Sequence, residues 1–218
     1  MNLLREDKGY YNNLMRELEE NDWEGFYGLM RMYPDFFHYL ERRLTPRLQK
    51  KDTNWRRALP VGLKLGLTLR YLATGIEFTE MHNAWRVGLS TVGKVVMEVC
   101  EAIIAEFQAE VLVAPQNAEE WRAVARRFEE RWNLPHCLGA LDGKHCKISQ
   151  PPHSGSLFFN YKKFFSIILL GLVNANYEFI WVDIGANGAC SDAQIYNESS
   201  LKTAIESKTI GWPPAEPL

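Results

Sequence analysis

The sequence has few cysteines, no long hydrophobic run and almost no net charge. Only four cysteines occur in 218 residues, and they are widely spaced, unlike the dense disulfide frameworks of small secreted domains. The longest apolar run, FSIILLGLV at residues 165–173, is far shorter than the roughly 20 residues that a membrane-spanning helix needs. The first residues, MNLLREDKGYYNN, lack the apolar segment of a secretory signal. We therefore expect an intracellular protein with reduced thiols and no membrane partner.

The net charge and the apolar content limit the possible partners and the number of domains. A formal net charge of −2 excludes a global attraction to nucleic acid, so such binding must come from a local patch. Apolar residues make up 46% of the chain, enough for one large domain or two small ones. One basic segment, residues 42–57 with the sequence RRLTPRLQKKDTNWRR, holds a single acid, Asp52. This segment is either a solvated connection or a track for nucleic-acid phosphates, and both interpretations remain open.

Helical periodicity dominates the N-terminal part of the chain. Apolar side chains recur at three- and four-residue steps from residue 3 to residue 40, and Pro34 is expected to begin a new helix with Asp35 in its first turn. A further helix is expected from Pro60 to Gly75. The aromatic residues of these helices indicate a helical core layer and require no ligand.

The next segment has the outline of a helix-turn-helix motif. Thr79 can cap a short helix, Gly88 allows a turn, and Ser90 can cap a long helix that follows. If this motif reads DNA, Thr91 and Lys94 near the start of the second helix would face the groove. Many helical bundles contain such a joint, so ordinary packing remains the alternative.

The periodicity changes from helix to strand near residue 134. Asn117 and Glu120 form a candidate capping box for one last helix, which must end by Pro135. Three strands are then expected at residues 138–148, 164–173 and 178–184, with a tight connection at 174–176. We expect a helical, DNA-binding region at 1–134 and a second domain at 135–218.

Asp142 is the best candidate for chemistry in the first of these strands. The stretch LGALDGKHCKI at residues 138–148 brings one carboxylate to a polar rim beside Lys144, His145 and Lys147. Such an arrangement resembles one half of a divalent-metal site for phosphodiester cleavage. The alternative is an ordinary turn, because Asp followed by Gly is common in turns.

Two later segments add candidates. The loop SQPPHSGSLFFNYKK, residues 149–163, carries aromatic residues with Lys162 and Lys163, which suit a surface loop or a contact to a DNA strand. Asp192 follows a glycine-rich bend and precedes a short helix. It is either a helix cap or first-turn acid, or a second metal ligand.

The dipeptide His-Cys occurs twice, at 136–137 and at 145–146. Zinc favours these ligands, but the spacing is not that of a zinc knuckle, and His145 and Cys146 point to opposite faces of a regular strand. Zinc is therefore a minor alternative.

Three blocks in this order, LGALDGKH, FNYKKFFSIILLGLVNANYEFIWVDIG and SDAQIYNESSL, resemble the DDE-type nuclease domain of PIF/Harbinger transposases and their domesticated relatives. The helical part, with LRYLATGIEF and STVGKVV, is similar to the helix-turn-helix region of that family, so the resemblance covers about residues 25–218. It implies an α+β protein with an N-terminal helical region and a partial ribonuclease H-like mixed sheet. It also implies DNA as partner, a possible protein partner for DNA recognition or nuclear import, and a nuclear location.

By motif, the family's metal-binding and catalytic acids fall on Asp142 and Asp192, with Mg²⁺ or Mn²⁺ as cofactor. Lys144 stands where threonine is common in the family. The family's later acids find no counterpart here, because Asp183, Glu198 and Glu206 do not lie in matching motifs. The resemblance therefore implies a C-terminally truncated member.

Two hypotheses follow. The first is a metal-dependent endonuclease of transposase origin. Its nucleic-acid contacts would include Lys144, Lys147, Lys162, Lys163, Lys94, Arg56 and Arg57. The second is a catalytically inactive, domesticated transposase that binds DNA or chromatin.

Overall fold

The computed structural model describes residues 2–54 and 57–214 of the chain, with side chains from residue 5 onward. The chain forms two compact units, Met1–Ala109 and Glu110–Leu218. This division lies earlier than the change of periodicity near residue 134, because periodicity reports secondary structure and not packing. None of the described helices combines the length and apolarity needed to cross a bilayer.

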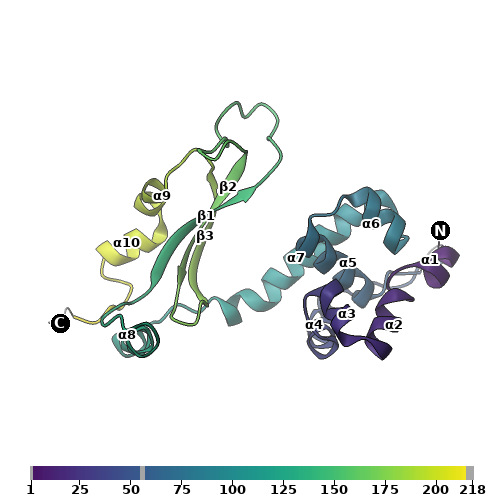
Figure 1. Ribbon diagram of the computed structural model, residues 1–218, viewed down its shortest axis with the longest axis horizontal. Coiled ribbons are helices and arrows are strands. Elements are labelled where there is room, and N and C mark those ends of the chain that lie inside the picture. The colour runs from purple at the N-terminus through teal and green to yellow at the C-terminus, as the bar shows by residue number, and fades with distance from the viewer. Residues whose placement is uncertain (1, 55–56, 215–218) are drawn as a thin grey trace. The chain divides into compact units, whose positions relative to one another are not determined.

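Helices build the N-terminal unit (Figure 1). They are α1 (Asn2–Lys8), α2 (Leu14–Asn21), α3 (Trp23–Met30), α4 (Pro34–Leu48), α5 (Val61–Thr74), α6 (Phe78–Trp85) and α7 (Leu89–Val111), the last of which continues into the second unit. Their core centres on fully buried side chains such as Phe26, Leu44, Leu65, Trp85 and Val92.

Several predicted helix ends are confirmed. Pro34 is the first residue of α4, with Asp35 in the first turn. Helix α5 ends at Gly75, whose φ of 65° is the left-handed conformation that glycine adopts without strain. Arg86 to Gly88 form the turn between α6 and α7, as the helix-turn-helix outline predicts.

The two predicted caps in this motif are wrong. Helix α6 begins at Phe78 with Glu77 at the N-cap position, so Thr79 lies inside the helix. Helix α7 begins at Leu89, because the carbonyl of Gly88 already accepts the N–H groups of Thr91 and Val92. Ser90 is therefore also an internal residue.

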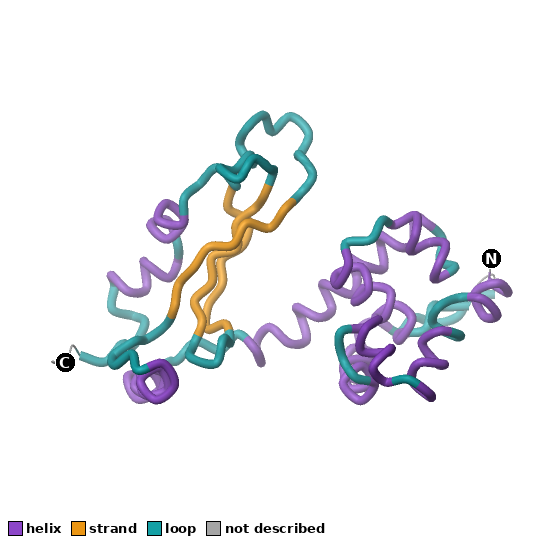
Figure 2. Tube along the Cα trace, viewed as in Figure 1, coloured by secondary structure: helices purple, strands orange, loops and turns teal. Residues whose placement is uncertain are grey.

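The C-terminal unit combines helices with one sheet (Figure 2). Its elements are α8 (Ala118–Trp132), β1 (Ala140–Lys147), β2 (Ser166–Val173), β3 (Phe179–Asn187), α9 (Asp192–Glu198) and α10 (Ser200–Glu206). The predicted Asn117 cap of α8 is confirmed, since its side chain accepts the N–H of Glu120. The long loop between β1 and β2 extends beyond the end of the sheet.

The described strands pair only antiparallel, in the order β1-β2-β3, so the expected mixed sheet is not what these residues form. The physical reason is the connectivity, because a turn at 174–178 and a loop at 148–165 each reverse the chain direction without a crossover helix. Strand β1 is left at the edge, with β2 as its partner.

One face of the sheet is covered by helices. Ile168 and Leu170 of β2 pack against Ile195 of α9. Leu172 shares a second cluster with Trp121 of α8 and Leu201 of α10. The indole Nε1 of Trp121 also donates to the carbonyl of Ile210 at 2.8 Å. Helix α8 is thus part of the core under the sheet, although its sequence pattern resembles that of the helices before it.

Candidate functional site

Asp142 lies within strand β1 and not in a turn. Its Cα is opposite that of Gly171, and the ladder between β1 and β2 continues without interruption from Ala140 to Lys147. Gly143 does not have a positive φ, so the Asp-Gly pair is extended. The turn interpretation is therefore wrong, because the apolar strand β2 offers these residues a continuous set of backbone partners, which outweighs their local turn preference.

Asp192 is the first residue of α9 and lies against strand β1. Ser191 is the N-cap, and it forms a complete capping box with Gln194. The Asp192 carboxylate fills the space where a Cβ on Gly143 would stand, and its Oδ2 is 2.7 Å from that position. A glycine at position 143 is thus what permits this close approach. Asp192 is a first-turn acid, as one of its two sequence interpretations held.

The two aspartates occupy opposite faces of β1. Residues directly opposite in an antiparallel pair share a face, and successive residues alternate. Gly143 is opposite Leu170, which packs against α9, so Gly143 faces the helices and Asp192. Asp142, one residue earlier, faces the other side. The structure therefore brings Asp192 to the strand that carries Asp142 but not to the face that the Asp142 side chain occupies.

This geometry decides how well the described residues fit a divalent cation. Carboxylates are the correct donors for Mg²⁺ or Mn²⁺, which need several oxygen ligands converging on one point. Within residues 2–54 and 57–214 there is no group of three or more His, Cys, Asp or Glu side chains that could hold a metal ion. With Asp142 and Asp192 on opposite faces, these residues do not fit a two-metal centre. The zinc alternative is likewise unsupported.

His145 shares a cavity with Asp192. The two line a hollow of about 420 Å³ together with Gly143, Tyr161 and Cys190. His145 is on the same face as Gly143, two residues away along β1. The ring of Tyr161 meets the imidazole edge to face, at 5.4 Å between centroids.

A buried polar network fixes the orientation of His145. Its Nδ1 is 2.9 Å from the hydroxyl of Ser166, which also accepts a hydrogen bond from the amide of Asn160 at 2.9 Å. Ser166 is fully buried and Asn160 is 3% exposed. The imidazole Nε2 has no hydrogen-bond partner in the described part of the chain. Sequence reasoning missed Asn160 and Ser166, although the serine at the start of the apolar run SIILLGLV, residues 166–173, could have marked one of them.

The predicted DNA-contacting lysines of this unit do not converge on one point. Side chains two residues apart in a strand share a face. Lys144 therefore shares the face of Asp142, whereas Lys147 shares the opposite face with His145. Lys162 lies in the loop before β2, with its Nζ 5.4 Å from the centroid of the Tyr161 ring. Lys163 is exposed in the same loop.

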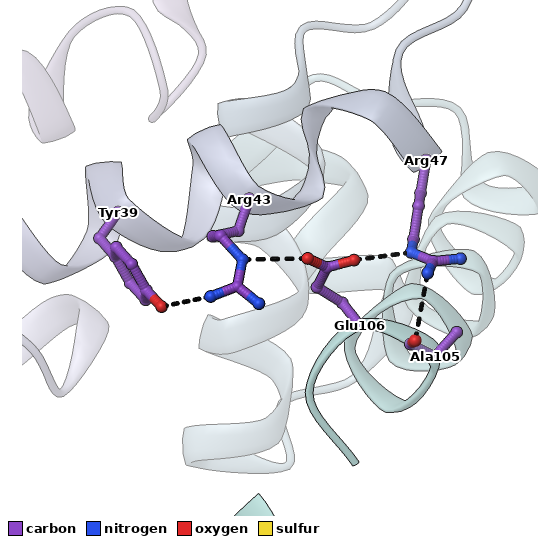
Figure 3. A network of polar contacts seen from close by, with 5 residues as sticks. All are labelled: Tyr39, Arg43, Arg47, Ala105 and Glu106. Atoms are coloured by element: carbon purple, nitrogen blue, oxygen red, sulfur yellow. Dashed lines mark hydrogen bonds and ion pairs between the residues drawn. The ribbon is translucent and has the colours of Figure 1, made fainter. Parts of the chain in front are cut away.

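The basic segment 42–57 is not a solvated connection as a whole. Its first seven residues belong to α4. There Arg43 and Arg47 hold Glu106 of α7 between them, with Nε to Oε distances of 2.9 and 3.0 Å (Figure 3). Hydrogen bonds from Arg47 and then Arg43 lower the pKa of Glu106. These two arginines thus hold α4 to α7 and share one carboxylate within the protein.

The remaining predicted contacts lie elsewhere in the N-terminal unit. Lys94 is exposed on α7. The guanidinium of Arg57 is exposed and lies 3.7 Å from the carboxylate of Glu6. Arg56 lies outside the described residues.

Comparisons with known proteins find similarity in the part of the chain that holds this site. Residues 141–216 match the family described as DDE superfamily endonuclease. The protein named Antagonist of Like Heterochromatin Protein 1, from Arabidopsis thaliana, is 26% identical over 155 residues, which cover 71% of this chain and 39% of that protein. Protein ALP1-like, also from Arabidopsis thaliana, is 24% identical over 145 residues, covering 66% of this chain and 35% of that protein.

The chain thus matches less than two fifths of the length of these relatives. No solved structure matches it. The family match begins at Leu141 and contains Asp142, Asp192, His145 and the polar network around it. Residues 141–216 are thus the part of the chain that is similar to the DDE superfamily endonuclease family.

Proposed function

We propose that this protein derives from a Harbinger-type transposase and binds DNA through its N-terminal unit. The observation that carries the proposal is the joint between α6 and α7. A three-residue turn at 86–88 connects the two helices, and Val87 within it is fully buried. In α7, Val92 and Val95 face the core while Lys94 is exposed and Thr91 half-buried. The start of α7 thus offers a hydroxyl and an ammonium group on its outer side, where a recognition helix contacts DNA.

The C-terminal unit supports the same origin. Its antiparallel strands β1 to β3 followed by α9 are consistent with the first part of a ribonuclease H-like domain, the fold that the resemblance implies. The relative named as an antagonist of a heterochromatin protein suggests that this chain also acts at chromatin. A nuclear location and a protein partner belong to this proposal. Because the described acids do not converge, binding takes precedence over cleavage.

Fluorescence anisotropy with a labelled duplex of about two helical turns tests DNA binding. We expect the affinity to fall steeply as salt is raised, because binding to phosphates releases counterions. Lys94→Gln should weaken binding at every salt concentration. Lys8→Gln is the matched control, since Lys8 is an exposed lysine of the same unit on a different helix. Absence of binding by the parent chain at about 50 mM salt, where phosphate contacts are strong, would refute the proposal.

Metal-dependent cleavage of DNA phosphodiester bonds is the second candidate. The family match over residues 141–216, which contains both Asp142 and Asp192, favours it. Nicking of supercoiled plasmid with Mg²⁺ or Mn²⁺ is the test, with Asp142→Asn and Asp192→Asn as variants. Asp35→Asn, an exposed acid in the first turn of α4, is the control. If the parent chain nicks the plasmid, both site variants must lose the activity; nicking that persists in them would come from another source.

A further inference from the structure

A cavity of about 260 Å³ lies in the N-terminal unit, between the loop after α4, helix α5 and the first turns of α7. Part of its lining is apolar and comes from Ala58, Leu59 and Val95. The charged part is almost entirely basic and comprises Lys50, Lys51, Arg57, Lys64 and Lys94. Two short polar side chains, Thr53 and Thr91, complete the set together with one acid, Glu98.

Glu98 forms ion pairs with two of these lysines. Its carboxylate accepts hydrogen bonds from Lys50 at 2.8 Å and from Lys64 at 3.0 Å. Burial alone would raise the pKa of Glu98, but the hydrogen bonds from Lys50 and Lys64 outweigh it and the pKa is lowered. Glu98 thus supplies a carboxylate partner to Lys64, which is only 2% exposed and would be costly to bury without one. Lys64 also donates to the carbonyl of Leu48 at 2.7 Å.

The other cations of the cavity are not matched in this way. Lys51 and Lys94 are exposed and make no ion pair or hydrogen bond with the residues that the structure describes. Arg57 lies 3.7 Å from Glu6, and both side chains are largely in solvent, where such a pair contributes little. One carboxylate thus faces five basic groups, and the cavity keeps a positive excess.

We propose that this cavity binds a phosphate group, carried either by the DNA backbone or by a free phosphate ester. Ammonium groups bind phosphate as point charges without demanding a fixed geometry, which suits the unpartnered Lys51 and Lys94. The Thr91 hydroxyl can add a hydrogen bond. Thr91 also lies in the first turn of α7, a helix of 23 residues, where aligned peptide dipoles favour an anion. That DNA supplies the phosphate group rests on the function proposed above, whereas the binding of phosphate itself does not.

The test compares the parent chain with the double variant Lys51→Gln/Lys94→Gln. Both side chains are exposed and unpartnered within the described residues, so their loss should leave folding intact, as circular dichroism would verify. Anisotropy measures binding to a DNA duplex, and calorimetry measures binding to inorganic pyrophosphate. We expect the double variant to bind DNA at least about tenfold more weakly, with a salt slope reduced by about two. Lys8→Gln should match the parent.

The outcomes distinguish failure of the proposed phosphate site from failure of the proposed DNA binding. If the parent binds DNA and the double variant binds it equally well, the phosphate site is refuted while DNA binding stands. If the parent binds pyrophosphate but not DNA, and the double variant loses pyrophosphate, the site is supported with a free phosphate ester as its source. Binding of neither probe by the parent refutes both proposals. A polyglutamate peptide that competes as well as DNA would overturn the assignment to phosphate.

Discussion

Gly143→Ala is the sharpest test of the contact that brings Asp192 to strand β1. A Cβ at this position would overlap the Asp192 Oδ1 and lie 2.7 Å from Oδ2. Non-bonded heavy atoms prefer about 3.5–4.0 Å. The added methyl group must therefore displace the Asp192 carboxylate or push α9 away from the strand.

The expected cost follows from that overlap. Overpacking by a methyl group costs about 1–3 kcal/mol. Loss of the conformational freedom of glycine in the unfolded chain offsets up to about 1 kcal/mol of this. The capping box of Ser191 and Gln194 fixes the backbone of Asp192, so only its side chain can move away cheaply. We expect Gly143→Ala to destabilise the C-terminal unit by about 1–2 kcal/mol.

A double-mutant cycle with Asp192→Ala isolates the cause. In the Asp192→Ala background, the methyl group meets no carboxylate, and Gly143→Ala should be nearly neutral, which corresponds to a coupling energy of about 1–2 kcal/mol. Hydrogen exchange of the β1 amides in increasing urea measures this unit separately from the other. Gly28→Ala is the control, since no atom lies within 4 Å of a Cβ there. An equal penalty with and without Asp192 would refute the contact.

Three further predictions concern the supports of the two units. Ser166→Ala should lower the free energy of unfolding by about 1–3 kcal/mol, because it leaves the buried amide of Asn160 without its acceptor. Urea denaturation measures this loss, and an unchanged midpoint would contradict the network. A hydrogen bond to Glu19 raises the pKa of His38, so its contribution to stability is complete below the unfolded value of about 6.5 and is lost as pH rises through the folded pKa. Melting temperatures across this range should show the loss in the parent and not in His38→Gln. Trp121→Phe removes a part-buried hydrogen bond at 2.8 Å but keeps most of the apolar surface, and it should cost about 1–3 kcal/mol. Unchanged calorimetric unfolding would show that the indole N–H is not needed.

The ends of several elements follow from residues close in sequence. Pro34 has no N–H to lose at the first position of α4, Gly75 tolerates the left-handed conformation after α5, and the Asn117 side chain caps α8. The strands after residue 138 follow from their apolar content and the turn at 174–178. These signals act within one or two turns of the chain, so the sequence alone is enough to predict them.

Two alternatives that the sequence left open were decided by partners that are distant in sequence. The Asp-Gly pair at 142–143 has the composition of a turn, yet pairing with residues 170–171 makes it a strand. The basic segment has the composition of a solvated patch, yet Glu106, about sixty residues away, binds Arg43 and Arg47.

The sequence by itself determined that the chain has a helical part, a strand-rich part with Asp142 and Asp192, and a resemblance to DDE nucleases, because each depends on local pattern. Only the tertiary structure decided which face each aspartate occupies, since strand alternation and the packing of α9 on Gly143 set it. It also decided which basic side chains lack an ion pair. The packing of α7 against α4, α5 and the loop between them determines which basic residues Glu98 and Glu106 contact.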